Sequence, residues 1–216
     1  MWVIKLGGSL LGTPELAHWL TLFARYGDGQ LVIVPGGGIF ADAVREAQRR
    51  TQCSDDTAHR MAVMAMDQYG MLLAGLNPAL VTASSELEIA ERGWQHRAIV
   101  WLPSAMVLAD EYIPASWQVT SDSLAAWLAA KLNAEQLVLV KSQRPDPGRV
   151  SLEALTEDGI VDERLGDFTT NQNFDSWILS RQDFAEFEQG LSVARLQQVG
   201  LRLPQQVDDA FENLGE

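Results

Sequence analysis

Cysteine and histidine are scarce in this chain of 216 residues, and their scarcity excludes two kinds of site. The single cysteine, Cys53, rules out an internal disulfide framework and a metal site built from several thiolates. The three histidines, His18, His59 and His96, are scattered and do not have the spacing of zinc ligands. We therefore expect no metal ion held by the protein's own side chains.

Basic residues are also few. Lysine and arginine together number 16 against 29 aspartates and glutamates, which gives a net charge of −13. Such an acidic chain lacks the basic surface that nonspecific nucleic-acid binding requires. Only three of the basic residues are lysines, Lys5, Lys131 and Lys141, and the first and last follow apolar runs.

Long hydrophobic runs are absent as well, since no stretch approaches the roughly 18 apolar residues of a membrane span. The opening segment MWVIKLGG does not combine a basic region, an apolar stretch and a cleavage site, as a signal peptide would. We expect a cytoplasmic protein that binds neither membranes nor nucleic acid.

The chain does contain short apolar runs, typical of buried strands, that alternate with amphipathic segments typical of helices. Strands are predicted at 2–6, 31–34, 79–83, 97–101, 137–141 and 176–179. Helices are predicted from Pro14 to about Gly27, at 39–50, 56–75, 84–93, 122–132 and 159–168, after Ser180, and in the acidic segment VDDAFENLGE. The alternation predicts an α/β fold, a three-layer αβα sandwich with a mainly parallel central sheet.

The polar segment 143–150, which contains two prolines and a glycine, is the candidate boundary within this fold. It divides the chain into a larger lobe at 1–142 and a smaller lobe at 143–216. We expect the two lobes to share one continuous sheet.

The first motif that indicates chemistry is KLGGS at 5–9, at the end of the first predicted strand. A lysine inside an apolar strand is costly unless its ammonium group meets an anion or the strand ends at a polar cleft. Two glycines let backbone N–H groups approach a ligand closely, and such a turn suits phosphate oxygens. A phosphate site and a simple tight turn both remain open for this segment.

The second motif is PGGG at 35–38, between the second strand and the next helix. Its N–H groups would lie at a helix N-terminus, whose partial positive charge favours anions, although a flexible corner is the alternative. The spacing G-x-G-x-x-A from position 36 formally fits the dinucleotide fingerprint, but Asp55 and Asp56 precede a helix instead of ending a second strand. No Walker A sequence occurs.

The third motif is TSDS at 120–123, at the start of an apolar helix. An ordinary helix N-cap would explain one of these polar side chains. Alternatively, Asp122 orients lysine ammonium groups around a transferring phosphate, with Lys141 at the end of the next strand as the second cation. Lys131 lies farther along the helix, where we expect it on the surface.

Together these segments resemble the amino acid kinase family, which includes acetylglutamate, aspartate, uridylate and isopentenyl phosphate kinases. The resemblance rests on KLGGS, VPGGG at 34–38, TSDS and LVLVK at 137–141, in the family's order, and covers about residues 1–142. Further stretches at 56–70, 113–129 and 158–162 resemble the small kinases of methanofuran-type cofactor biosynthesis. Those enzymes phosphorylate [5-(aminomethyl)furan-3-yl]methyl phosphate to its diphosphate.

The resemblance implies an ATP-dependent kinase with a phosphate group as acceptor, with Mg²⁺ bridging the ATP phosphates, and a homodimer. The implied catalytic residues are Lys5, Asp122 and Lys141. The residues implied to hold the ATP phosphates are Gly7, Gly8 and Ser9. Those expected to bind the acceptor are Gly36, Gly37, Gly38, His59, Arg60, Thr120 and Ser121. The lobe at 1–142 would bind the acceptor and carry catalysis, and the lobe at 143–216 would lie on the nucleotide side.

The helix predicted at 56–75 allows two interpretations. His59 and Arg60 could reach the acceptor, and Asp67 or Asp56 could pair with a substrate amine. Alternatively, this is a core or dimer-facing helix with ordinary surface charges.

One departure from the family pattern keeps other functions open. Many members carry a V-D-G-V-Y-like stretch after the strand that corresponds to 137–141, whereas the sequence here is KSQRPDPG at 141–148. The alternatives are a kinase for another phosphate acceptor, such as isopentenyl phosphate or UMP, and a non-catalytic member that binds a nucleotide or oxyanion.

Overall fold

The computed structural model describes residues 1–204, and their centre is one sheet of seven strands. The strands are β1 Trp2–Leu6, β2 Leu31–Pro35, β3 Leu80–Ala83, β4 Ala98–Trp101, β5 Gln136–Lys141, β6 Asp175–Ser180 and β7 Leu201–Arg202. They lie in the order β3-β4-β2-β1-β5-β6-β7, and every pair is parallel except β6 with β7. The predicted mainly parallel sheet is confirmed, and it runs through the proposed boundary at 143–150 because β5 pairs with β6.

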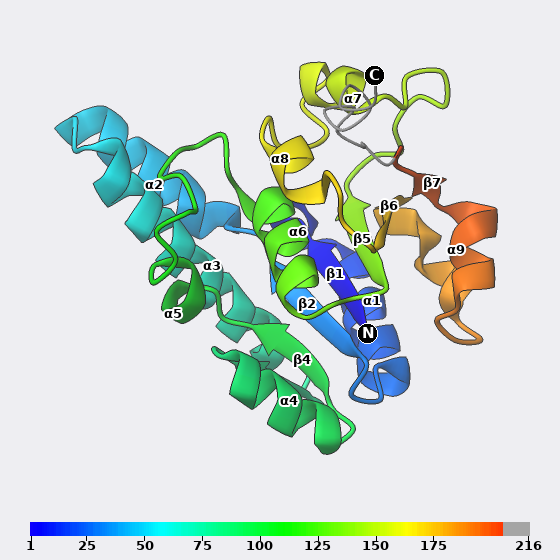
Figure 1. The fold of residues 1–216 in the computed structure, drawn as a ribbon. Coiled ribbons are helices and arrows are strands. Elements are labelled where there is room, and N and C mark those ends of the chain that lie inside the picture. Colours follow the sequence, from blue (N-terminus) through cyan, green and yellow to red (C-terminus); the bar gives the residue numbers. More distant parts are fainter. Residues whose placement is uncertain (205–216) are drawn as a thin grey trace, which may run out of the picture.

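Helices cover both faces of this sheet and complete the predicted three-layer α/β fold (Figure 1). They are α1 Pro14–Tyr26, α2 Gly38–Thr51, α3 Asp55–Leu76, α4 Glu86–Trp94, α5 Ser104–Val107, α6 Ser121–Lys131, α7 Leu152–Glu157, α8 Leu165–Thr169 and α9 Val193–Val199, with the 3₁₀ helices η1 Gly8–Leu10 and η2 Arg181–Phe187. Figure 1 shows α6 in front of β1 and α1 behind it. One buried apolar cluster includes Leu124 and Leu128 of α6, and a second includes Trp19 and Phe23 of α1.

The alternation of side chains along each strand decides on which face the strand lysines lie. Val3 of β1 belongs to the cluster on the α6 side, and Ile4 belongs to the cluster on the α1 side. Lys5, two residues after Val3, therefore faces α6. Leu139 of β5 also lies on the α6 side, so Lys141 faces α6 as well.

Parallel pairing brings the carboxyl ends of neighbouring strands to one edge of the sheet, where ligands bind in open α/β folds. β1 lies between β2 and β5, with Leu6 opposite Pro35 on one side and Val140 on the other. The glycine segments that follow β1 and β2 are therefore neighbours, next to the end of β5.

The region after β5 departs from the prediction. The sequence predicts a helix at 159–168, but the structure has α7 and α8, separated by a turn at Gly159 with a φ of +65°. A positive φ favours glycine and interrupts a helix, so the predicted start at 159 was wrong, whereas α8 confirms a helix at the end of the predicted range. The capped segment after Ser180 is confirmed as the 3₁₀ helix η2, with a capping box between Ser180 and Asp183. The helix predicted for VDDAFENLGE lies outside the described residues.

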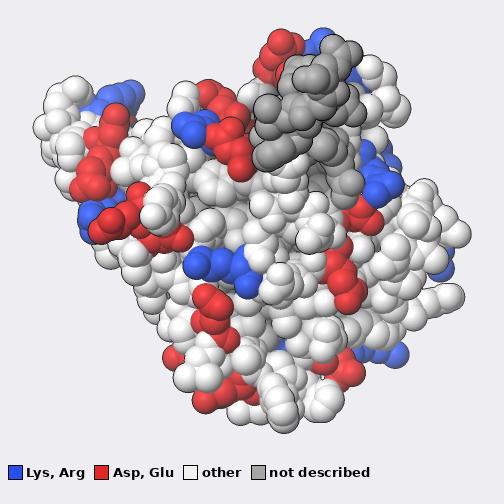
Figure 2. Space-filling model, in the orientation of Figure 1, with Lys and Arg blue, Asp and Glu red and all other residues white. Residues whose placement is uncertain are grey.

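Charged side chains of both signs are spread over the surface. Figure 2 shows acidic and basic side chains interspersed on one face, with most basic groups beside acidic ones. Among residues 1–204, no helix combines the length and the apolar character needed to cross a bilayer.

Candidate active site

The ends of β1 and β5 and the first turn of α6 bring three charged side chains together. Oδ1 of Asp122 lies 3.0 Å from Nζ of Lys5, and Oδ2 of Asp122 lies 2.5 Å from Nζ of Lys141. The exposed fractions of these side chains are only 9% for Lys5, 4% for Asp122 and 12% for Lys141. The structure thus joins the three residues that the sequence analysis predicted as catalytic.

Burial and charge set the ionisation of this cluster. Burial opposes the ionised form of Asp122, but the ammonium groups of Lys141 and Lys5 outweigh it and lower the pKa of the carboxyl to about 2. Burial lowers the pKa of Lys141 to about 8, although the Asp122 carboxylate acts in the opposite direction. Asp122 is therefore a fixed anion near neutral pH, whereas Lys141 loses its proton at a pH just above neutral.

A further carboxylate, that of Asp162, reaches the start of α6 from the segment between α7 and α8. It accepts hydrogen bonds from the N–H of Thr120 at 3.0 Å, from the Thr120 hydroxyl at 2.5 Å and from the N–H of Ser123 at 2.9 Å. The Thr120 side chain itself makes no capping hydrogen bond. Burial raises the pKa of Asp162, and the nearby Asp122 carboxylate adds to that shift. A residue 42 positions after Thr120 thus caps α6.

The two glycine segments pack backbone against backbone beside this cluster. A β-carbon on Gly8 would lie 2.3 Å from the Cα of Gly38, and one on Gly36 would lie 2.6 Å from the nitrogen of Gly8. Gly38 also has a φ of +53°, which strains any other residue. The close approach of the segments requires glycine at these positions, whether or not a ligand binds there.

One cavity, of about 380 Å³, opens beside the lysines. Its lining comprises Lys5, Gly7, Gly8, Ser9, Val140, Lys141, Ser142, Gln143, Asp158, Gly159 and Ile160. Two cations and a glycine turn suit the phosphates of a nucleotide. All three residues predicted to hold ATP phosphates line this cavity, which we call the smaller cavity.

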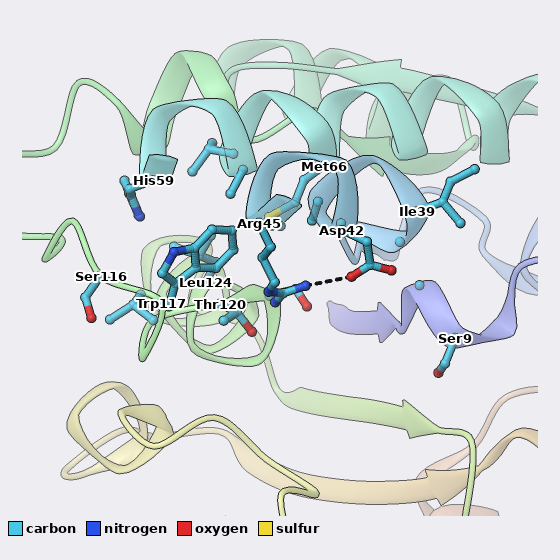
Figure 3. A pocket seen from close by; sticks show the side chains of 18 of the residues that line it. Ser9, Ile39, Asp42, Arg45, His59, Met66, Ser116, Trp117, Thr120 and Leu124 are labelled. Carbon is cyan, nitrogen blue, oxygen red and sulfur yellow. Dashed lines mark hydrogen bonds and ion pairs between the residues drawn. The ribbon is translucent and has the colours of Figure 1, made fainter. Parts of the chain in front are cut away.

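A second cavity, of about 510 Å³, shares Gly8 and Ser9 with the smaller cavity. Figure 3 shows the side chains that line it. Val63, Met66 and Leu124 form part of its apolar wall. Its polar lining comprises Ser9, Asp42, Arg45, His59, Ser116, Thr120 and Ser121, together with the backbone of Gly8, Gly37 and Gly38. Five residues predicted to bind the acceptor, Gly37, Gly38, His59, Thr120 and Ser121, therefore line this larger cavity.

Trp117 and Arg45 form one wall of the larger cavity. The guanidinium carbon of Arg45 lies 4.5 Å from the centroid of the Trp117 ring, and its Nη1 pairs with Asp42 at 2.9 Å (Figure 3). The indole N–H of Trp117 donates to Gln48 at 2.7 Å, which fixes the ring. One charge of each sign, on Arg45 and Asp42, is thus available at this cavity.

His59 lines the larger cavity, and burial lowers the pKa of its imidazole, so the neutral form predominates at pH 7.

The structure does not bring every predicted residue to the site. Arg60 instead pairs with Asp56 at 3.1 Å on the exposed side of α3, away from the described lining residues. Gly36 also lies outside this lining, and its N–H donates to the carbonyl of Leu6 at 2.9 Å.

Neither carboxylate suggested for a substrate amine lies in the larger cavity. Asp67 accepts hydrogen bonds from the N–H and the hydroxyl of Ser104, so it caps α5. Asp56 is paired with Arg60. Among the described residues that line the cavity, the acidic one is Asp42.

Sequence reasoning missed Asp162, Arg45 and Trp117 as site residues. Asp162 belongs to the stretch 158–162 that contributed to the family resemblance, but the sequence predicted no function for its side chain. Arg45 and Trp117 lie on separate elements, and no local spacing joins them.

The parallel sheet, the glycine segments and the buried cluster define a protein of the amino acid kinase class. The family model described as "Amino acid kinase family" matches residues 1–144, and the chain belongs to this family. The chain is 30% identical over 141 residues to the [5-(aminomethyl)furan-3-yl]methyl phosphate kinase of Methanocaldococcus jannaschii. That match spans 64% of this chain and 64% of the relative, less than two thirds of its length.

Solved structures support the same fold at lower identity. Uridylate kinase from Archaeoglobus fulgidus matches with a TM-score of 0.64 and 16% identity, over 86% of this chain and 94% of that one. An isopentenyl phosphate kinase matches with a TM-score of 0.58 and 16% identity, over 94% of this chain and 100% of that one.

Proposed function

We propose that this protein transfers the γ-phosphoryl group of ATP to the phosphate group of a small acceptor. The observation that carries this proposal is that the buried cluster of Lys5, Asp122 and Lys141 lies beside two cavities that share Gly8 and Ser9. We propose [5-(aminomethyl)furan-3-yl]methyl phosphate as the acceptor and its diphosphate as the product, in methanofuran-type cofactor biosynthesis. Membership of the family and the name of the relative from M. jannaschii support this acceptor.

The proposed reaction needs no covalent enzyme intermediate. A terminal oxygen of the acceptor phosphate attacks the γ-phosphorus of ATP, a new P–O bond forms, and the bond to the β-phosphate oxygen breaks so that ADP leaves. A phosphate dianion carries no proton on the attacking oxygen, so no general base is required. Catalysis then consists of positioning and charge neutralisation, which two lysines held by one carboxylate can supply.

The smaller cavity suits the ATP phosphates because Lys5, Lys141 and the Gly7-Gly8 turn surround it. Within residues 1–204, no group of three or more His, Cys, Asp or Glu side chains is placed to hold a metal ion. We propose that Mg²⁺ would enter with ATP, held by its phosphates, and would supply further positive charge beside Lys5 and Lys141. Residues 158–160 line this cavity from beyond the boundary at 143–150, which supports the assignment of the smaller lobe to the nucleotide side.

The larger cavity suits a small phosphate that carries a ring and an amine. The glycine turn at 37–38 and Ser121 would hold the acceptor phosphate near the shared Gly8. The apolar wall offers a surface for a flat ring. The Asp42 carboxylate would accept the ammonium group, in place of its pair with Arg45.

We also propose that the protein is a homodimer in the cytoplasm. Met64, Met71 and Leu76 leave apolar surface exposed along α3, which suits contact with a second subunit. The single cysteine fits a reducing compartment.

Two alternatives have observations in their favour. The similarity to solved isopentenyl phosphate and uridylate kinases favours another phosphate acceptor. The segment 141–148, which lacks the V-D-G-V-Y-like stretch, favours a non-catalytic binder of nucleotide or oxyanion.

A panel of acceptors separates these functions. Purified protein with Mg-ATP is given the furanyl methyl phosphate, isopentenyl phosphate or UMP, and ADP release is measured. We expect the highest kcat/KM with the furanyl compound. Release only with isopentenyl phosphate or UMP would replace the proposed acceptor, and nucleotide binding without ADP release would establish the non-catalytic alternative.

The substitution Asp42→Asn tests recognition of the amine within the same panel. It should lower kcat/KM for the aminomethyl acceptor about tenfold and leave kcat/KM unchanged for an analogue with a hydroxyl group in place of the amine. Asp56→Asn, which alters an exposed carboxylate on α3, is the matched control. An equal loss of kcat/KM with both acceptors would mean that Asp42 does not bind the amine.

A further inference from the structure

The segment 158–162 connects the two cavities through the start of α6. Asp158, Gly159 and Ile160 line the smaller cavity. Val161 is buried in the same apolar cluster as the α6 side chains. Asp162 then binds the N-terminus of α6 through Thr120, which itself lines the larger cavity. A single short segment therefore contacts the smaller cavity and fixes a residue of the larger one.

The way in which α6 is capped differs from the way in which other helices of this chain are capped. Ser54, Ser85 and Ser151 cap α3, α4 and α7 with their own hydroxyls. Thr120 occupies the N-cap position of α6, yet its side chain makes no capping hydrogen bond, and Asp162 accepts the hydrogen bonds instead. The remote carboxylate of Asp162 thus caps the same first turn of α6 from which Asp122 binds both lysines.

We infer that Asp162 is a positioning residue, which holds the start of α6 so that Asp122 stays between Lys5 and Lys141 and Thr120 stays at the larger cavity. This inference rests on the proposed function and extends it. Three hydrogen bonds to one carboxylate fix the first turn of the helix, and a negative charge at a helix N-terminus is also favourable. A displacement of about 1 Å at reacting groups can cost about 10²-fold in rate.

Asp162 has a second effect, on charge balance. The charges that act on Lys141 are those of Asp122 on α6, Lys5 on β1 and Asp162, and together with Lys141 they sum to zero. Asp158, which lines the same cavity, pairs with Arg149 at 3.0 Å and so adds no net charge. Without Asp162, two buried ammonium groups would share one carboxylate, which is unfavourable. The charge of Asp162 raises the pKa of Lys141, and that of Lys5 lowers the pKa of Asp162.

The test compares Asp162→Asn with Glu163→Gln. Glu163 is the neighbouring carboxylate, exposed and hydrogen-bonded to the Gln118 side chain at 2.7 Å, so it is a matched control. We expect Asp162→Asn to lower kcat at least about tenfold and to move the alkaline fall of kcat/KM for Mg-ATP to lower pH. Glu163→Gln should leave both quantities unchanged. Asp162→Glu keeps the charge, so it should keep the alkaline fall at the wild-type pH while kcat stays reduced.

A helix cap without a positioning role would lower the melting temperature of Asp162→Asn but leave kcat and the alkaline fall as in the wild type, and that result would overturn the inference. If Asp162→Asn does not fold, Asp162→Glu decides, since full wild-type kcat in that variant contradicts a positioning role. Failure of the proposed function is distinguishable, because the wild-type protein would then release no ADP with the furanyl acceptor.

Discussion

The buried charges at the ends of β1 and β5 and the exposed ion pairs on α2 and α3 use the same chemistry in opposite surroundings. Asp122 holds two lysines in a site where each side chain is at most 12% exposed. Arg60 and Asp56 form a pair of similar length, 3.1 Å, with both side chains more than half exposed. Distance alone therefore does not distinguish the buried cluster from a surface pair, whereas burial beside a cavity does.

The difference has a thermodynamic cause. Exposed pairs contribute up to about 1 kcal/mol, because water already solvates both partners. A buried cluster must offset the loss of that solvation, so it persists only where geometry and charge balance are good. A chain with only three lysines that buries two of them in one cluster thus points to a role in binding anions.

Among the substitutions in the buried cluster, removal of the Lys5 ammonium group should lower kcat most strongly. Lys5→Met keeps an apolar stem in β1 but loses the charge next to the smaller cavity, so kcat should fall about 10³-fold. The melting temperature should change little, because Asp122 retains Lys141. Steady-state ADP release and thermal unfolding of the same preparation check both parts, and activity near the wild-type level would refute the role of Lys5.

Asp122→Asn should have the next largest effect. The amide cannot neutralise two ammonium groups, so both lysines lose their fixed positions and kcat should fall about 10²-fold. The affinity for ATP should change less than kcat, since the lysine charges remain. Stability should also fall, by about 3–5 kcal/mol, because the substitution leaves buried cations unpaired. Calorimetric titration with ATP and denaturant unfolding measure these effects, and an unaltered turnover would leave Asp122 with a structural role only.

Lys141 adds a pH dependence that the exposed pairs lack. Its pKa of about 8 lies below the ordinary 10.5, so kcat/KM for Mg-ATP should fall as pH rises through about 8, when the ammonium loses its proton. Stability should move in the opposite direction. Between about pH 8 and pH 10.5 the unfolded chain keeps a proton that the folded chain has released, so this group favours folding more as pH rises.

Lys141→Arg is the control for the pH prediction, because a guanidinium stays charged throughout this range. A folded and active Lys141→Arg variant should show no fall near pH 8. A wild-type profile that stays level to pH 10, the highest pH of the titration, would contradict the assignment.

Substitution in an exposed ion pair should have the smallest effect on stability and on KM. Arg60→Gln removes a surface pair on α3, so the free energy of unfolding should change by less than about 0.5 kcal/mol, and KM for the acceptor should stay within about twofold of the wild type. Acceptor titrations and urea unfolding measure these quantities. A large rise in KM would return Arg60 to the acceptor site that the sequence predicted for it.

The sheet and the buried cluster could be predicted because each depends on local sequence. Buried parallel strands are continuous apolar runs, and the lysines in two such runs stand out. The alternation of side chains along a strand then places Lys5 and Lys141 on one face without knowledge of the rest of the fold.

The structure places Arg60 away from the cavity because successive residues of a helix point about 100° apart, so His59 faces the cavity and Arg60 faces outward. The role of Asp162 could not be predicted, because its partners precede it by about 40 residues and no strand register joins them. The glycine segments were predicted for ligand binding alone, whereas the contact between Gly8 and Gly38 shows that packing also requires them.

Phosphorus NMR of the complete reaction follows the proposed transfer of a phosphoryl group from the smaller to the larger cavity, past the buried cluster. With wild-type protein, Mg-ATP and the furanyl methyl phosphate, we expect ADP and a furanyl product whose two phosphorus signals are mutually coupled, as in a diphosphate. Lys5→Met should give neither at a comparable rate. Inorganic phosphate in place of the diphosphate would show hydrolysis of ATP instead of transfer, and full product formation by Lys5→Met would show that the buried cluster does not catalyse the transfer.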